Sequence, residues 1–470
     1  MAEALMAPAA GVPGEECRIN ALPTDVLLRA LSHLDALQVV QTCVLSRRWR
    51  DLWRSVPRIS ATHKAFKGTA DTMEECDALF KTFVNRFLML RNPIALHEFN
   101  LGYYVQDEDD ASKDYRAESE DANLWIGHTL QCNARSIHVS VADVRLPLDS
   151  SLFTSNFLNS LELTSVVLFR GFFANLQIGC TVLEHLTLSE CYIEDAEICS
   201  QTLKVFTIGS GCEFSFSERP TISIQSLVHF GYDLCIPIPL LLPNMESLQT
   251  ASVSVNGTDV TLVDHIYQVL CRLSGVTNLD FHYIGKTVYI LFYSEGIVLT
   301  KLYLAHDFCL HSISHPNPLN SGQLKMEKNV QWCPKFNNLT ILSLGEWCLY
   351  ENFYALIIFL QNSPNLVKLT LELPEVHASC VWIQKKDSTF LGDLEERSFT
   401  CKHLKIVEII CSEYSEDGPM FHSLEKLLTD NGITSGQTGI IHRTGPSSDF
   451  VCIKNRNQIP ERHLFDETPM

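Results

Sequence analysis

The chain has 470 residues, and its 36 basic and 55 acidic side chains give a formal net charge of −19 at pH 7. So acidic a chain repels nucleic-acid phosphates and anionic lipid, and we expect neither as a partner. The sequence is 46% hydrophobic, as in a protein with a buried core, but no apolar run reaches the ~18–20 residues that span a bilayer.

The seventeen cysteines predict a soluble intracellular protein whose thiols are reduced. Residues 1–19 lack the basic and apolar regions of a secretory signal and read as a flexible tail. An odd cysteine count without regular spacing argues against a disulfide framework. We therefore expect many cysteines to be small buried hydrophobes and place the protein in the nucleus, the cytoplasm or both.

Residues 20–60 are expected to form a compact helical unit. Pro23 suits the first turn of a helix, because its missing N–H costs little there. One face of that helix is apolar through Leu27, Leu31 and Leu34. Asp35, with Gln38 three residues later, predicts a capping box and a second helix.

A third helix is expected after Ser46, which can cap it. This helix would carry Trp49, Leu52 and Trp53 on one face. Three short helices with two tryptophans cannot bury all of that surface among themselves, so part of it is expected to be an interface. The segment has six arginines against three aspartates, and this favours an acidic protein partner. The alternative is a free-standing three-helix bundle.

Residues 61–95 are expected to be a helical linker. Apolar side chains between residues 72 and 91 have the spacing of an amphipathic helix. The acidic residues between 107 and 121 are expected to form a solvated loop, with an acidic docking site as the alternative.

Residues 96–373 carry a recurring leucine pattern. Its clearest copy is Leu183-Glu-His-Leu186-Thr-Leu188-Ser-Glu-Cys191-Tyr-Ile193, which fits the leucine-rich-repeat consensus. Copies begin at residues 96, 134, 158, 183, 203, 227, 248, 276, 299, 339 and 366, and a further copy beyond this range begins at residue 404. Most are 20–28 residues apart, and each of the three longer intervals could hold an extra helix, an insertion or a missed repeat.

These repeats predict an α/β fold: an N-terminal three-helix unit followed by an irregular solenoid with a parallel sheet on its concave face. Each copy would be a short strand that buries its leucines only when neighbouring strands stack against it. The alternative is an ordinary α/β domain with leucine-rich parallel strands.

One residue in each repeat, between the last two apolar positions, is expected to point out of the sheet. These residues are Asn100, His138, Glu162, Thr187, Thr207, Gly231, Ser252, Asp280, Tyr303, Ser343, Thr370 and Glu408. They include three acids and no lysine or arginine, whereas phosphate recognition relies heavily on arginine. We expect this row to bind a basic or neutral polar segment of a target. The main candidates are Glu162, Thr187, Asp280, Tyr303 and Glu408.

The N-terminal unit resembles the F-box of plant F-box/leucine-rich-repeat proteins. The resemblance rests on Leu22-Pro23-x-Asp25-Val26-Leu27 and above all on Cys43-Val-Leu-Ser-Arg-Arg-Trp-Arg-x-Leu-Trp53. It implies docking on the small SKP-type adaptor of cullin–RING ubiquitin ligases. The residues that would supply contact, or the core behind it, are Leu22, Pro23, Val26, Leu27, Leu31, Val44, Leu45, Trp49, Leu52 and Trp53. The chain departs from its relatives at Asp35–Gln38, where they often carry Pro and Arg.

The C-terminal region divides at about residue 432. Residues 374–432, with Phe399–Ile409 and Ser423–Leu428, are similar to the FBD region that follows the repeats in many relatives. Residues 433–470 are polar, with several Gly and Pro, and are expected to be a divergent or disordered end.

No catalytic, cofactor or metal motif stands out. The nearest to metal-ligand spacing is the cluster His306, Cys309, His311 and His315, but it lies in a stretch rich in Ser, Pro and Asn. No cysteine has a marked base or cation beside it. The resemblance therefore implies a non-catalytic substrate receptor that raises the effective concentration of target and ubiquitin. The alternatives are a repeat scaffold that works without the ligase and an enzyme that uses a cysteine.

Overall fold

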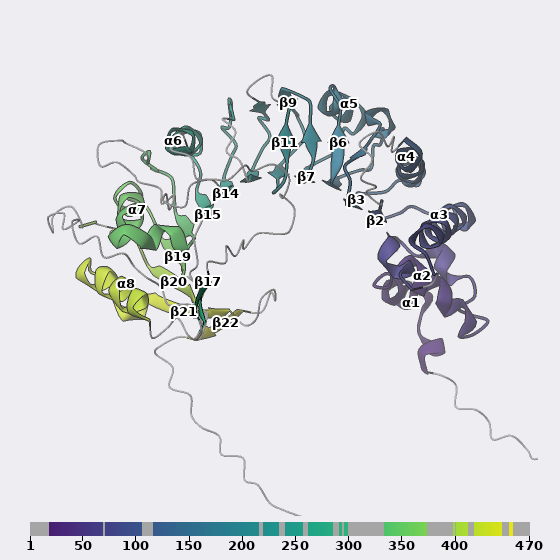
Figure 1. Cartoon of the computed structure of the whole chain (residues 1–470), viewed down its shortest axis with the longest axis horizontal. Helices are drawn as coiled ribbons and strands as arrows, with labels where there is room; N and C mark the ends of the chain where they lie inside the picture. Colours follow the sequence, from purple (N-terminus) through teal and green to yellow (C-terminus); the bar gives the residue numbers. More distant parts are fainter. Residues whose placement is uncertain are drawn as a thin grey trace, which may run out of the picture. The chain divides into compact units, whose positions relative to one another are not determined.

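The structure is a computed structural model that forms two units (Figure 1). The first comprises residues 1–186 and 190–194, and the second residues 187–189 and 195–470. The residues it describes are 18–68, 71–105, 116–215, 220–234, 240–256, 262–284, 291–293, 296–298, 333–373, 398–399, 401–411, 418–443 and 451–454. Several predicted features fall wholly or partly outside these ranges: most of the N-terminal tail, residues 107–115 of the acidic segment, Tyr303, the His306–His315 cluster, residues 374–397 and the last sixteen residues.

The first unit opens with short helices. These are η1 (Arg18–Ala21), α1 (Thr24–Leu31), α2 (Ala36–Gln41), η2 (Thr42–Val44) and η3 (Leu52–Ser55). The predicted capping box is confirmed. Asp35 Oδ1 accepts a hydrogen bond from the backbone N–H of Gln38 at 2.9 Å, and Gln38 Oε1 accepts one from the N–H of Asp35 at 3.3 Å.

The predicted third helix is wrong. Residues 47–51 form turns, flanked by the 3₁₀ helices η2 and η3. The Ser46 hydroxyl donates to Asn20 Oδ1 at 3.4 Å and does not cap a helix. The indole of Trp49 also points to Asn20. The backbone hydrogen bonds of this segment span three residues, as from Trp49 N–H to Ser46 O at 3.1 Å, and not the four residues of an α-helix.

The linker forms more structure than one helix. The expected helix is confirmed as α3 (Met73–Leu90), and the Thr72 side chain caps it by accepting from Glu75 N–H at 3.2 Å. Before it come β1 (Arg58–Thr62) and η4 (His63–Phe66). Strand β1 pairs in parallel with β2 (Glu98–Tyr104), so the sheet already begins at Arg58.

Parallel strands continue through the first unit. They are β1, β2, β3 (Ser136–Ala142) and β5 (Ser160–Thr164), with β7 (His185–Ser189) at the boundary of the two units. The return segments hold β4 (Leu146–Pro147), β6 (Val166–Leu168), β8 (Tyr192–Ile193), η5 (Ser150–Leu152), α4 (Arg116–Gln131) and α5 (Phe172–Gly179). Helix α4 accounts for the long interval between the repeats at 96 and 134, and it includes Glu118, Glu120 and Asp121 of the predicted acidic loop.

The second unit repeats the same arrangement. Its main strands are β10 (Val205–Ile208), β13 (His229–Leu234), β14 (Thr250–Asn256), β15 (Asn278–Ile284), β18 (Ile341–Leu344), β19 (Lys368–Glu372), β20 (Ile406–Cys411), β21 (Thr438–Arg443) and the antiparallel β22 (Val451–Lys454). Figure 1 shows its helices α6 (Leu262–Arg272), α7 (Tyr350–Gln361) and α8 (Pro419–Asp430) on one side of the strands. The smaller elements are β9 (Glu197–Cys199), β11 (Glu213–Phe214), β12 (Thr221–Ser223), β16 (Leu291–Tyr293), β17 (Gly296–Val298), η6 (Glu346–Leu349) and η8 (Ser435–Gln437).

The predicted fold class is confirmed. Thirteen of the fourteen strands in the main sheet, all but β22, are parallel and follow chain order. Eleven of the twelve predicted repeats have a strand that begins two residues after the predicted start, as in β2, β15 and β20. Their leucines and phenylalanines are buried in alternation with half-exposed polar residues, because successive strand residues face opposite sides.

One predicted repeat is wrong, and the expected disorder of residues 433–470 does not hold for residues 438–443 and 451–454, which are strands. Strand β18 pairs directly with β15, so no strand from the predicted repeat at Leu299 lies between them. In the expected divergent end, β21 pairs with β20 and buries Ile440 and Ile441. The leucine pattern missed β21 because its buried residues are isoleucines between polar neighbours.

Candidate functional site

The first unit exposes an apolar surface at its N-terminal end. Val44 and Leu45 are 83% and 64% exposed, and Leu22 and Val26 are also exposed. The Ser46–Asn20 hydrogen bond links the segment after α2 to the segment before α1. These side chains, with exposed Pro23, form what we call the N-terminal patch. Clustered exposed apolar side chains of this kind mark interaction sites.

The other predicted contact residues lie behind the patch. Leu27 and Leu31, on the opposite face of α1, are buried, and Leu52 is half-buried. Trp49 and Trp53 are only 6% and 9% exposed, so they belong to the core behind the patch and not to its exposed surface. The count of three helices alone left out α3, whose Phe87 packs against Trp53 with ring centroids 5.3 Å apart.

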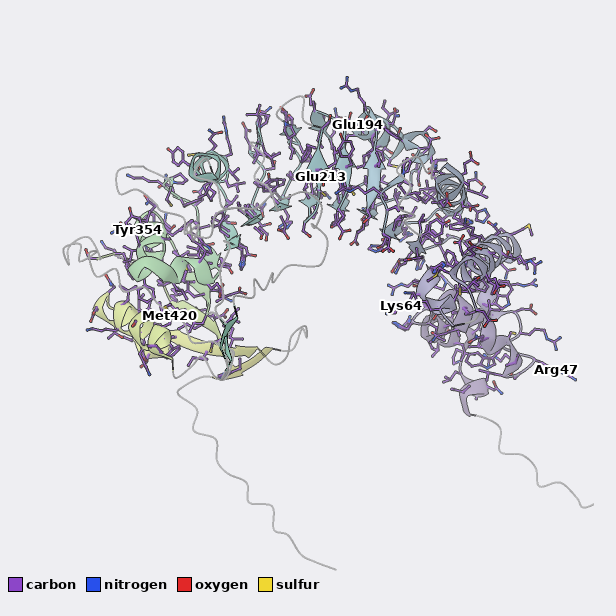
Figure 2. The ribbon with its side chains drawn as sticks, in the orientation of Figure 1. Arg47, Lys64, Glu194, Glu213, Tyr354 and Met420 are labelled. Carbon is purple, nitrogen blue, oxygen red and sulfur yellow. The ribbon has the colours of Figure 1, made fainter. Side chains whose placement is uncertain are left out.

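The surroundings of the N-terminal patch are basic. Arg47, Arg48 and Arg50 are exposed, and Figure 2 shows Arg47 extending away from the ribbon. Arg54 pairs with Asp51 at 3.5 Å. No ion pair joins Arg47 or Arg50 to another described residue. A partner with acidic groups around an apolar centre would complement this surface.

The predicted outward row is in register within each unit. In the first unit, Asn100 lies beside His138, and His138 lies beside Glu162. His138 Nδ1 and Glu162 Oε2 are 2.8 Å apart. In the second unit the row runs through Thr207, Gly231, Ser252, Asp280, Ser343, Thr370 and Glu408. Thr187 is a half-buried residue of β7.

Asp280 is the best-connected member of the row. Its Oδ2 accepts a hydrogen bond from the Ser252 hydroxyl at 3.1 Å, and its Oδ1 lies 2.8 Å from His282 Nε2. Burial raises the pKa of Asp280, but the interaction with His282 and the hydrogen bonds from Ser343 and Ser252 outweigh it and hold the pKa below its usual value. The carboxylate is therefore charged at neutral pH.

A second outward row, two residues further along the strands, was missed from the sequence. Asp233, Ser254 and His282 lie side by side in it. Glu372 Oε2 lies 3.8 Å from His282 Nδ1. Burial raises the pKa of Asp233, against a hydrogen bond from Ser254. Period-two alternation was the available signal, since residues two apart share a face.

Glu408 is less available than the sequence suggested. Lys368 Nζ lies 2.8 Å from Glu408 Oε2, and Thr370 donates to the same oxygen at 3.4 Å. Lys368 lies on the same face of the sheet as Glu408, in the row two residues earlier. The sequence analysis counted charges in one row only and therefore left Lys368 out.

A shallow depression lies on the sheet between β13 and β18. It is lined in part by His229, Thr250, Ser252, Asp280 and Ser343.

Four of the described thiols are poor nucleophiles because they are buried or half-buried. Burial raises the pKa of Cys180 and Cys401 to about 11 and that of Cys333 and Cys348 further still. Within the described ranges, no group of three His, Cys, Asp or Glu side chains could hold a metal ion. None of the helices in those ranges is long and apolar enough to cross a membrane.

Comparison with known proteins shows which family the chain resembles. The F-box domain model matches residues 19–60. F-box/LRR-repeat protein 13 of Arabidopsis thaliana is 28% identical over 94% of this chain and 93% of its own length. An FBD-associated F-box protein of the same plant is 30% identical over 74% of this chain and 75% of its own length. This chain belongs to the family of FBD-associated F-box and F-box/LRR-repeat proteins.

In this F-box/LRR-repeat protein the two modules share a strand. The F-box match ends at residue 60, inside β1, which pairs with β2 of the first leucine repeat.

Another F-box/LRR-repeat protein of Arabidopsis thaliana is 28% identical over 75% of this chain and 72% of its own length. The described part of the FBD-like region consists mainly of β20 and α8.

Proposed function

We propose that this protein is a substrate-recognition subunit of an SCF-type cullin–RING ubiquitin ligase. The N-terminal patch would dock on the SKP-type adaptor and, through it, on the cullin and RING subunits. The observation that carries the proposal is the exposure of Val44 and Leu45, 83% and 64%, within a matched F-box domain. Burying apolar area of this kind supplies the main favourable free energy of association.

The proposed chemistry is proximity and not catalysis by this chain. The F-box holds the protein on the ligase, and the outward face of the repeats holds a target protein. The ligase then brings activated ubiquitin close to a target lysine, and the raised effective concentration increases the transfer rate. We propose the nucleus, the cytoplasm or both as the location.

Target binding would use the outward rows of the sheet. Asp233, Asp280 and Glu372 supply carboxylates on the second unit, and Glu162 supplies one on the first. A basic or neutral polar segment suits these groups better than a phosphorylated one. Reversing the charge of Glu162, Asp280 and Glu372 should weaken target capture. Unchanged capture of a phosphopeptide by this variant would contradict the assignment.

Adaptor binding is tested by co-purification with a recombinant SKP-type adaptor. Replacing Val44 and Leu45 by serine, or Leu22 and Pro23 by alanine, should abolish the complex. Ile178→Ser is the matched control, because Ile178 is an apolar side chain of similar exposure, 78%, outside the F-box match. If wild type and all variants bind equally, the patch is not the docking site.

The competing function is a repeat-based interaction scaffold that works without the ligase. The continuous outward rows of polar side chains favour it equally well, since they need no F-box partner. Absence of adaptor binding by the wild-type chain, together with retained target capture, would select the scaffold.

A further inference from the structure

The segment that carries Leu22 and Pro23 has little local structure to hold it. Helix α1 begins at Thr24, its N-cap is Pro23, and no side chain caps it. The preceding η1 is a single 3₁₀ turn, and Leu22 N–H donates to Ile19 at 3.3 Å. A four-residue 3₁₀ turn is too short to be stable alone. The position of this exposed pair must therefore be set by other parts of the fold.

The first contact that sets it is the side chain of Asn20. Its Oδ1 accepts a hydrogen bond from Trp49 Nε1 at 2.8 Å and another from the Ser46 hydroxyl at 3.4 Å. Trp49 is buried, and a buried indole N–H requires an acceptor. Asn20 thus ties the segment before α1 to the Ser46–Trp49 turn.

The second contact is the guanidinium of Arg48. One of its terminal nitrogens donates to the backbone oxygen of Asn20, and the other to the backbone oxygen of Leu22. The second nitrogen also lies 3.4 Å from the Thr24 hydroxyl. The planar fork of arginine can span two carbonyls, whereas the ammonium of lysine acts as a point charge. Arg48 therefore fixes the backbone on both sides of Ala21 by hydrogen bonds.

We propose that Asn20 and Arg48 form a latch that positions Leu22 and Pro23 for the adaptor. Both are positioning residues: they act through the backbone they hold. The inference rests on the proposed function and divides the neighbouring arginines into two roles. Arg48 shapes the interface, while Arg47, which makes no ion pair with a described residue, offers charge to the partner. Pre-ordering a binding segment strengthens binding by reducing the entropy lost on association.

The latch is tested in the full chain with two readouts. Amide hydrogen exchange of residues 18–24 in the free protein reports the latch directly, and adaptor affinity at several salt concentrations reports its consequence. Arg48→Ala and Arg48→Lys should both speed exchange there and weaken binding, roughly 5- to 30-fold if one or two net hydrogen bonds are lost. Arg47→Ala is the matched control: it should leave exchange unchanged and reduce only the salt-sensitive part of binding.

Asn20 supplies a rescue experiment. Asn20→Ala should loosen residues 18–24 and weaken adaptor binding. Asn20→Asp keeps an oxygen that accepts from Trp49 and Ser46 and should restore both. If Asn20→Ala unfolds the F-box, the comparison of Arg48→Lys with Arg47→Ala still decides the question.

The outcomes separate the latch from the proposed function. Unchanged exchange in Arg48→Ala, or equal and equally salt-dependent losses in Arg47→Ala and Arg48→Lys, overturns the latch. A wild-type chain that does not bind the adaptor overturns the proposed function and, with it, the latch's role in binding.

Discussion

Protonation of His63 should destabilise the start of the repeats. His63 is 1% exposed, and neither ring nitrogen has a hydrogen-bond partner among the described residues. Its ring packs against Phe80 and Tyr104, with centroids 5.3 and 5.5 Å away. Burial lowers the pKa of His63, Asp77 opposes this, and Lys67 and Lys81 add to it. The imidazole is therefore neutral in the folded chain at pH 7.

The sign and size of the pH effect follow from linkage. Because the folded pKa lies below the unfolded value of about 6.5, the unfolded chain binds more protons as the pH falls. The stability that neutral His63 contributes is thus present above pH ~6.5 and is lost as the pH falls towards the folded pKa. The uptake of one proton limits the loss in the free energy of unfolding to at most about 1.4 kcal/mol per pH unit.

The assay is urea unfolding followed by tryptophan fluorescence, with amide exchange in α3 as a local readout. Trp125 reports this region, because its ring lies 5.7 Å from Phe80. His63→Phe should remove this part of the pH dependence, while exposed His33→Asn should leave it intact. Parallel pH profiles for wild type and His63→Phe would refute the reasoning.

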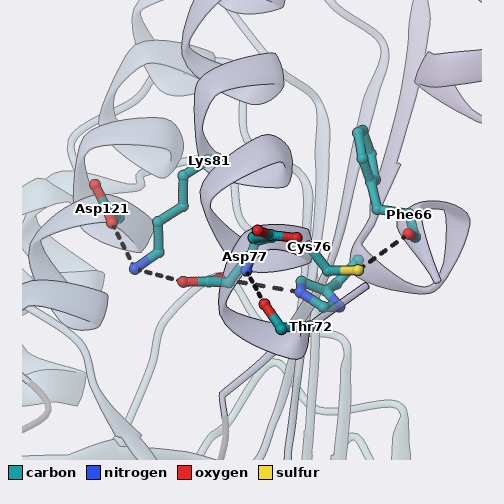
Figure 3. A network of polar contacts seen from close by, with 8 residues as sticks. Phe66, Thr72, Cys76, Asp77, Lys81 and Asp121 are labelled. Atoms are coloured by element: carbon teal, nitrogen blue, oxygen red, sulfur yellow. Dashed lines mark hydrogen bonds and ion pairs between the residues drawn. The ribbon is translucent and has the colours of Figure 1, made fainter. Parts of the chain in front are cut away.

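Three further predictions concern other parts of the fold. Lys81→Met should lower the free energy of unfolding by about 1–3 kcal/mol, measured by thermal unfolding. Lys81 Nζ lies 3.0 Å from Asp77 and 3.4 Å from Asp121 and separates the charges of these two carboxylates (Figure 3). An unchanged free energy of unfolding would show that solvent screens the two aspartates from each other. Ile440→Ala in β21 should lower the free energy of unfolding by about 2–5 kcal/mol, measured by urea unfolding. A decrease of less than about 0.5 kcal/mol would mean that β21 does not pack into the core. Gly231→Ala should lower the melting temperature, since a Cβ atom would lie 2.7 Å from the Thr207 hydroxyl; an unchanged melting temperature would mean that Thr207 rotates away.

The repeats were predictable because their physics is local and periodic. A copy such as Leu366, Leu369 and Leu371 places leucines on the buried side of one strand, and β19 begins two residues after the first of them. The capping box of Asp35 and Gln38 was also predictable, because it involves only residues close together in the chain. The outward row followed from the same alternation, and its register confirms it in both units.

The features that were missed depend on contacts distant in sequence. Ser46 could cap a helix, but its hydroxyl reaches Asn20 across 26 residues. Strand β1 has no leucine and is fixed by pairing with β2. Lys368 neutralises Glu408 from a neighbouring strand, so the charge of the outward face could not be read from one residue per repeat.

The sequence predicted where the N-terminal patch lies in the chain, but not which of its residues are exposed. The family motif marked ten residues, and the fold exposes five of them while it buries or half-buries the rest. Helical periodicity put Leu27 and Leu31 on one apolar face, but the sequence reading did not separate them from Val26, which the structure leaves exposed. It could not predict that Trp49 would turn inward to Asn20, because that depends on a turn in place of a helix.

Calorimetric titration of the full chain with a purified SKP-type adaptor probes the central claim most directly. A one-to-one complex with micromolar or tighter affinity, lost in the Val44→Ser, Leu45→Ser double variant and kept in Ile178→Ser, is the expected result. A folded wild-type chain that releases no binding heat and elutes apart from the adaptor at micromolar concentration would contradict it.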